Sequence, residues 1–129
     1  MTYALFDYVK ENGDNDFRLW TEGLQIKERA KLNEKLDKLA TYGDELYPHL
    51  LTDTDVPGIQ KLRVKGNVQL RPLLCRGPVF VGKEYTLLFG AKEVGGKLQP
   101  ANAPTKAGDR KAQVKANPQS RRKLHERVT

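Results

Sequence analysis

Four cationic side chains lie in the segment 59–72, IQKLRVKGNVQLRP, which contains no carboxylate. Apolar and polar residues alternate on either side of KGN, a pattern that predicts two strands joined by a turn. Side chains two residues apart on a strand lie on the same face, so we expect Lys61, Arg63 and Lys65 to point the same way. A tight turn then brings Arg71 near Lys61 or Arg63. Grouped ammonium and guanidinium ions bind phosphate and stabilise negative charge that develops in a transition state.

The charge of the chain is unevenly divided. Its formal net charge is +7, yet residues 1–58 hold 7 Lys or Arg and 12 Asp or Glu, whereas residues 59–129 hold 16 and 4. No carboxylate occurs between Asp55 and Glu84. This gradient predicts a polyanionic partner for the second half, either nucleic acid or another polyphosphate. An acidic protein partner is the alternative, and the two are compatible.

The first half of the chain predicts one strand and two helices. Residues 2–9, TYALFDYV, alternate in a β-favouring pattern, and ENGDND then supplies a turn. A short helix follows, capped by Asn15 or Asp16. Residues 24–43 form the clearest helix, because their apolar residues recur at helical spacing and Gly43 is typical of the position just beyond a helix end. The apolar residues expected in the core are Phe17, Trp20, Leu32, Leu36, Leu39 and Ala40.

The second half predicts strands followed by a basic helical tail. Three strand-like runs, IQKLRV, NVQLRPLLC and EYTLLFGAKEV, are separated by Gly66 and by RGPVFVGK. Pro72 has no backbone N–H, so we expect a sheet edge, a bulge or a bend at that point. In the tail, TKAGDRKAQVKAN predicts one helix that ends at Asn117-Pro118, and PQSRRKLHERV predicts the start of another. Both are poor in apolar residues and therefore need a surface on which to dock.

The order of elements indicates an α+β fold: a small antiparallel sheet, N-terminal helices packed on one face of it, and a basic C-terminal helical tail. A length of 129 residues fits one domain. No apolar run approaches the roughly 18 residues that a membrane-spanning helix needs, and the N-terminus lacks a secretory pattern. Cys75 is the only cysteine, which excludes an internal disulfide and a Cys-rich zinc site. We therefore expect a cytoplasmic protein that does not bind a membrane.

Three segments in this order resemble the RelE/ParE superfamily of toxins and, within it, the phage-derived HigB-like branch. They are KERAKLNEKLDKLATYG, IQKLR…VQLRP and YTLLFGAKE, and the resemblance covers roughly residues 3–95. It implies a RelE-like toxin domain over residues 1–96, with residues 97–129 as a basic C-terminal extension of the same domain. It also implies a type II toxin–antitoxin system with a helix-turn-helix antitoxin as partner. Most RelE-like and HigB-like members enter the ribosomal A site and cut mRNA there, whereas ParE-like members act on DNA gyrase.

The resemblance implies a metal-independent mRNA endonuclease, in which the 2′-OH of the substrate attacks the adjacent phosphate. In RelE-like enzymes Arg, Lys and Tyr carry out most of this chemistry. The residues that match the family's basic site, and that we expect to be catalytic, are Arg63, Lys65 and Arg71. The cations expected to bind RNA are Lys61, Arg76, Lys92, Arg110, Lys111, Arg121, Arg122 and Lys123. Neither a metal nor a cofactor is expected.

The chain departs from the family pattern near the end of the last long strand. RelE-like enzymes have a Tyr where this chain reads FGAKEVGGKLQP, and HigB-like members often have a His where it has Phe89-Gly90. Tyr85, His49 and His125 remain as hydroxyl and imidazole candidates, with Tyr85 expected in the core and His49 on the surface. Two alternatives therefore stay open. One is a non-enzymatic toxin that binds a protein such as DNA gyrase, and the other is a phage-derived nucleic-acid-binding protein without toxicity.

Overall fold

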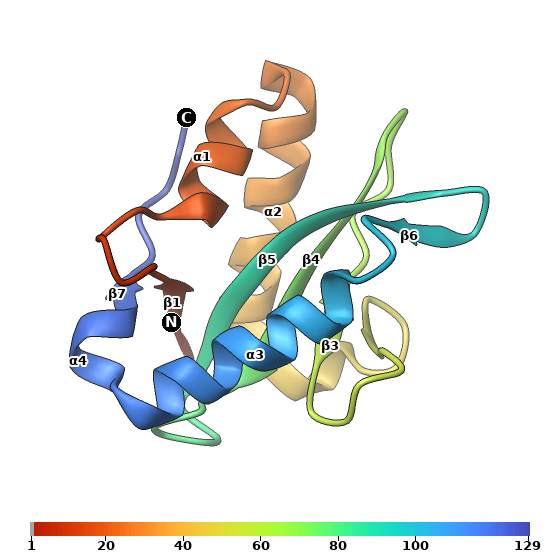
Figure 1. The fold of residues 1–129 in the computed structure, drawn as a ribbon. Helices are drawn as coiled ribbons and strands as arrows, with labels where there is room; N and C mark the ends of the chain where they lie inside the picture. Colours follow the sequence, from red (N-terminus) through yellow and green to blue (C-terminus); the bar gives the residue numbers. More distant parts are fainter. Residues whose placement is uncertain (1) are drawn as a thin grey trace.

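A computed structural model of the chain describes residues 2–129 (Figure 1). The first part forms a strand, two helices and a short 3₁₀ helix: β1 (Ala4–Tyr8), α1 (Asp16–Glu22), α2 (Ile26–Tyr42) and η1 (Gly43–Leu46). The middle forms five strands: β2 (Leu51–Asp53), β3 (Gln60–Leu62), β4 (Gln69–Arg76), β5 (Glu84–Val94) and β6 (Lys97–Gln99). The C-terminal part forms α3 (Ala103–Ala116), α4 (Pro118–Arg121) and β7 (Arg122–Leu124). The α+β class predicted from the sequence is confirmed.

The strands form one mixed sheet in the order β2-β3-β4-β5-β1-β7, and β6 pairs with the end of β5. Its strands pair antiparallel except for β1 and β5, which run parallel. The expectation of an antiparallel sheet is therefore wrong at this pairing. Parallel neighbours need a long crossover connection. The chain supplies one, because α1, α2 and three strands lie between β1 and β5 in the sequence.

The N-terminal helices cover one face of the sheet, as the sequence predicts. The side chain of Asn15 caps α1 by accepting a hydrogen bond of 3.0 Å from the backbone N–H of Arg18. Along α2 the apolar stripe faces the strands, and Gly43 ends the helix with a φ of 53°. Burial of one such leucine contributes about 1.5–3 kcal/mol. The core on this face includes Phe17, Leu32, Leu36, Leu39, Ala40, Leu62, Val64, Leu70, Leu74 and Leu87.

Helix α3 covers part of the opposite face, so the sheet is sandwiched between helices. Figure 1 shows α3 crossing in front of β4 and β5, with α2 behind them. Ala103, Ala107 and Val114 of α3 are fully buried and form a second core with the strands. The basic tail is thus docked on the sheet through α3. The small side chains of α3 let it lie close to the sheet despite its low apolar content.

The end of the tail differs from the prediction of a further long helix. Helix α4 spans only Pro118–Arg121, and the next three residues form β7, which pairs antiparallel with β1. Val128 is buried, and its carbonyl oxygen accepts a hydrogen bond of 2.8 Å from the side chain of Asn33 in α2. These contacts attach the tail to the first half of the chain over most of its length.

Pro72 itself is paired regularly with Gly90 of β5, so the irregularity predicted at that residue is not in β4. The register shifts just beyond it, because Leu73 pairs with Phe89 and Leu74 with Leu87. Leu88 of β5 is therefore the extra residue, as in a β-bulge, which bends the strand that carries it. Within residues 2–129, no helix is long and apolar enough to span a bilayer.

Candidate functional site

Two of the predicted strand cations meet at one carboxylate. Lys61 Nζ of β3 lies 3.8 Å from Glu93 Oε1, and Arg71 Nη2 of β4 lies 3.5 Å from Glu93 Oε2. The hairpin brings Arg71 near Lys61, as expected, because Lys61 pairs with Leu73, two residues beyond Arg71 on the same strand. Glu93 reaches both cations from β5, where it pairs with Gln69.

Arg63 joins this group at a surface cavity of about 300 Å³, lined by Thr52, Asp53, Lys61, Arg63 and Glu93. We call Lys61, Arg63, Arg71 and Glu93 the strand cluster. The hydroxyl oxygen of Thr52 is buried and has no hydrogen-bond partner within residues 2–129. A buried polar atom without a partner is uncommon and costs free energy. The cavity therefore has an unpartnered hydroxyl in its wall beside two cations and two carboxylates.

Arg71 is the buried member of the strand cluster. Its side chain is 3% exposed, its Nη1 donates to the carbonyl oxygen of Leu70 at 2.8 Å, and its Nη2 lies 3.3 Å from Oε1 of Gln69. Its Nε atom has no partner in the described part of the chain. The guanidinium of Arg71 is thus buried, and Glu93 lies between it and the more exposed Lys61. The expectation that Arg71 itself contacts the substrate is not supported by this position.

Glu93 is the functional residue that sequence reasoning missed. The sequence has no carboxylate between Asp55 and Glu84, which suggests that the strand cations are unpaired. Glu93, however, lies on the neighbouring strand β5, and its side chain is on the same face of the sheet as Arg71. Alternation along β5 is the signal that could have placed it: Ala91 and Glu93 share the face of Arg71 in the observed register. The continuous apolar run of Leu87, Leu88 and Phe89 hides that alternation.

Lys65 and Lys92 lie away from the cavity. Lys65 is exposed in the turn between β3 and β4, and it lines none of the cavities around the strand cluster. Lys92 is exposed on β5, where it pairs with Leu70 and Gln99. Because it neighbours Glu93 on a strand, its side chain points to the other face. The structure thus separates these two lysines from the other strand cations.

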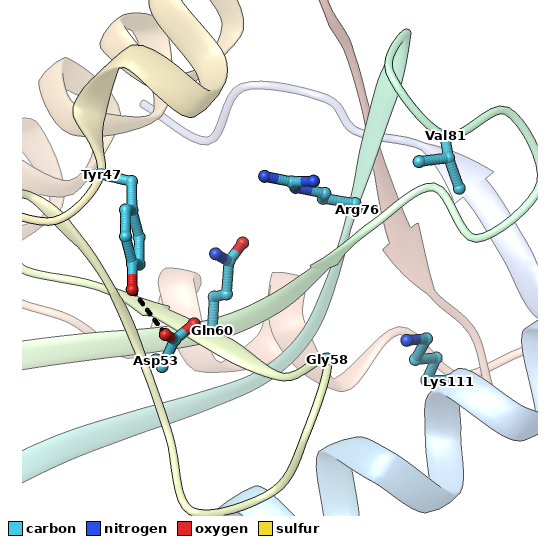
Figure 2. A pocket seen from close by; sticks show the side chains of 7 residues that line it. All are labelled: Tyr47, Asp53, Gly58, Gln60, Arg76, Val81 and Lys111. Carbon is cyan, nitrogen blue, oxygen red and sulfur yellow. Dashed lines mark hydrogen bonds between the residues drawn. The ribbon is translucent and has the colours of Figure 1, made fainter.

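Arg76 and Lys111 meet at a different cavity, which Figure 2 shows from close by. Arg76 is at the end of β4, and its Nη2 lies 2.9 Å from Oδ2 of Asp44. Lys111 comes from α3 on the other side of the opening. Asp53 lines both this cavity and that of the strand cluster, so the two are neighbours across the end of β2.

The tail cations that we expected to bind RNA are held by carboxylates. Arg110 lies 2.8 Å from Asp16, and Arg121 lies 3.7 Å from Glu11. Arg122 pairs with the buried carboxylate of Glu84 and stacks on the ring of Phe6, and Lys123 pairs with Glu126 at 3.7 Å. These four side chains are paired within the fold, and their role in RNA binding stays a prediction. Of the predicted tail residues, Lys111 alone makes no ion pair with the residues that the structure describes.

The remaining hydroxyl and imidazole candidates are occupied or exposed. Tyr85 is buried as predicted, and burial together with its hydrogen bond to Asp44 raises the pKa of its hydroxyl. His49 is exposed. His125 Nδ1 lies 2.8 Å from Oδ1 of the buried Asp7. None of the three lines the cavity of the strand cluster, which therefore has no tyrosine or histidine side chain.

Gly90 gives a physical reason for one departure from the family pattern. A side chain at this position would collide with the indole ring of Trp20 from α1, which packs directly over the glycine. Trp20 also lies against Phe17, with ring centroids 5.4 Å apart. The space that a histidine would need is therefore filled by the core under α1.

The strand cluster combines groups for proton transfer and for charge stabilisation. Glu93 is 23% exposed and Lys61 is 25% exposed, so both can contact a ligand in the cavity. A carboxylate accepts a proton, whereas an ammonium group donates one and attracts an anion. The residues that line the cavity, together with the buried Arg71, include three cations and two carboxylates, one of which is Asp53. No group of three or more His, Cys, Asp or Glu side chains suited to a metal ion occurs among residues 2–129.

Comparison with known proteins gives this site no counterpart. No family model, no curated protein and no solved structure matches the chain.

Proposed function

We propose that this protein is the toxin of a type II toxin–antitoxin pair and that it cleaves mRNA at the strand cluster without a metal. The observation that carries the proposal is the meeting of Lys61 and Arg71 at Glu93, beside Arg63 and an unpartnered Thr52 hydroxyl. The order of elements and the segments that resemble RelE-like toxins support it. A cluster with both an acid and a base also favours an enzyme over a purely protein-binding toxin.

The cluster can perform each step of RNA cleavage by the 2′-OH. Glu93 takes the proton of the 2′-OH, and the resulting alkoxide attacks phosphorus. Lys61 and Arg63 then stabilise the added negative charge on the phosphoryl oxygens, where it develops in the transition state. The P–O5′ bond breaks, and the leaving oxygen receives a proton from Lys61. The products are a 2′,3′-cyclic phosphate and a 5′-OH end.

Arg71 and Thr52 position the reacting groups in this scheme. Arg71 holds Glu93 from beneath the surface, which fixes the orientation of its carboxylate. The Thr52 hydroxyl lies opposite Lys61 in the pairing of β2 with β3. The hydroxyl is buried, so Thr52 forms part of the wall against which Lys61 is placed. Positioning of this kind reduces the entropy lost on reaching the transition state.

Purified protein with a defined mRNA, with and without ribosomes, tests the proposal. We expect cleavage that resists EDTA, and a loss of about 10²–10⁴-fold in rate for Glu93→Gln, which removes the base but keeps the shape. Arg63→Ala, a change at a half-buried residue of the same cavity, should lower the rate while the protein stays folded. Lys92→Ala is the matched control, because Lys92 is the neighbour of Glu93 on the other face.

Growth measurements complete the test. Induction should arrest translation before DNA replication, and co-expression of the product of the neighbouring reading frame should relieve the arrest. Arrest of replication first, with translation unaffected, would instead identify a gyrase-directed toxin. Full cleavage by a folded Glu93→Gln protein would remove the strand cluster as the catalytic site.

A further inference from the structure

The cavity of Figure 2 has a buried polar group that the proposed chemistry leaves unused. It measures about 480 Å³ and is lined by Tyr47, Asp53, Gly58, Gln60, Arg76, Val81 and Lys111. These residues come from both faces and from one end of the sheet. The volume lies within the range of about 300–1,000 Å³ that small-molecule sites occupy.

Gln60 supplies the central group of this cavity. The residue is 8% exposed, and its Oε1 atom has no hydrogen-bond partner within the described chain. Figure 2 shows its amide directed into the space between Tyr47 and Arg76. A buried acceptor in this state lacks a donor. A ligand that carries an N–H group would supply it.

Two cations border the same space. Lys111 has no ion-pair partner in the part of the chain that the structure describes, and its amine lies over Gly58. A Cβ at Gly58 would come within 2.6 Å of that amine, and the φ of 80° there favours glycine as well. Arg76 uses one nitrogen for Asp44, which leaves further donors for an anion. Together they provide a site for a phosphate group.

Tyr47 forms the remaining wall and is held in place. Its hydroxyl donates to Oδ2 of Asp53 at 2.7 Å, and this hydrogen bond raises the pKa of the tyrosine. The side chain is 45% exposed. An aromatic ring fixed at the edge of a cavity is a surface on which a nucleobase can stack.

We infer that this cavity binds one nucleotide of single-stranded RNA, whose base carries an exocyclic amino group. The amino group donates to Oε1 of Gln60, the base lies against Tyr47, and Lys111 and Arg76 hold the phosphate. Because Asp53 separates this cavity from the strand cluster, the bound nucleotide is a neighbour of the one that is cut. The inference rests on the proposed function for the identity of the polymer, and it assigns Gln60 the role of selecting the base.

Binding of free nucleotides, followed by NMR, tests this site without any cleavage. The probes are 5′-CMP and 5′-UMP, two pyrimidine nucleotides that differ at the amino group. We expect the wild-type protein to bind CMP about tenfold more tightly than UMP, because CMP donates to Oε1 of Gln60 in its present orientation, whereas the O4 acceptor of UMP requires the buried amide to rotate. Gln60→Leu should abolish this preference. Lys111→Ala should weaken the binding of both nucleotides and of inorganic phosphate. Lys115→Ala, one turn further along α3, should leave the binding of all three unchanged.

Thermal unfolding without ligand separates a binding role from a structural one. Gln60→Leu removes a buried oxygen that has no partner, so this variant should be at least as stable as the wild type. Equal binding of CMP and UMP by the wild type, or a CMP preference that survives in Gln60→Leu, would overturn the inference. Absence of saturable CMP binding would do the same. Since no step of this assay involves Glu93, the nucleotide site stands or falls independently of RNA cleavage.

Discussion

The strand cluster and the C-terminal tail are both rich in cations, yet the structure uses their charges differently. In the tail, Arg110, Arg121 and Arg122 each reach across the fold to a carboxylate. In the strand cluster, two cations share the single Glu93 at the edge of a cavity, and Arg63 lines that cavity as well. Three tail cations, Arg110, Arg121 and Arg127, pair with carboxylates of the acidic first half. The strand cluster instead places its cations at a cavity.

This difference shows how a charge gradient along a sequence is to be interpreted. A net charge of −5 over residues 1–58 and +12 over residues 59–129 predicts a polyanionic partner only when the two halves lie apart. Here β7 pairs with β1, so the halves partly neutralise one another. Arg63, Lys65 and Lys111 are among the second-half cations that form no ion pair within residues 2–129, and such cations remain for an external ligand.

The largest effect should come from breaking the tail at its most buried ion pair. Arg122→Ala leaves the carboxylate of Glu84, 3% exposed, with only the backbone N–H of Phe80 at 2.8 Å. Removal of one partner of a buried pair costs about 3–5 kcal/mol, which urea unfolding will measure. Arg127→Ala is the control, because its pair with Asp37 is exposed and such a change costs less than about 0.5 kcal/mol. Equal losses for the two variants would show that the tail is not held by buried charge.

Cys75 tests whether α3 stays docked, because its thiol lies in the core beneath that helix. Burial raises the pKa of Cys75 to about 12 from 9.0, although the nearby charge of Lys111 opposes the shift. The folded state disfavours the thiolate, so this contribution to stability is complete below pH 9 and is lost as the pH rises toward 12. From pH 8 to pH 10 the wild type should lose about 1.4 kcal/mol more than Cys75→Ala.

Thiol labelling gives a direct measurement of the same property. At pH 8 the folded protein should resist iodoacetamide, and urea should make Cys75 reactive. Fast labelling of the folded protein would mean that α3 leaves the sheet readily. In that case the tail would be a mobile basic segment after all.

The smallest effect is expected in the salt dependence of RNA binding. Each cation that contacts a phosphate of a single strand contributes about −0.7 to the slope of log K against log salt. Arg63→Ala should therefore reduce the slope by about 0.7, whereas Arg127→Ala, which removes a cation already paired with Asp37, should leave it unchanged. A larger change of the slope for Arg127→Ala than for Arg63→Ala would contradict the conclusion that Arg63 is free to bind RNA and that Arg127 is not.

Local patterns in the sequence predicted much of the fold. The Asn15 cap, the apolar stripe of α2 and its end at Gly43 each depend on residues close together in the chain. Residues 60–62, 69–76 and 84–94 form strands where alternation and β-favouring residues predicted them. Helix α3 ends at Ala116, immediately before the predicted Asn117-Pro118 boundary.

The features that escaped prediction depend on contacts between distant segments. The parallel pairing of β1 with β5 and the strand β7 are defined by partners more than 70 residues away. Strand pairing also placed Glu93 beside Lys61 and Arg71, and no spacing within a single segment shows that. The cavity at Gln60 combines residues of β2, β3, β4 and α3 with residues of the loops between them, so its residues share no local motif.

The position of β1 has a consequence for the time at which the molecule becomes functional. β1 leaves the ribosome early, but both strands that flank it, β5 and β7, are synthesised long afterwards. A nascent chain therefore has an incomplete sheet until residues 122–124 emerge. The hydrogen bond from Asn33 to the carbonyl oxygen of Val128 forms later still. Long-range closure of this kind folds late. A chain interrupted before this point would lack the finished scaffold under its cavities, so the product of an aborted round of translation should be inert.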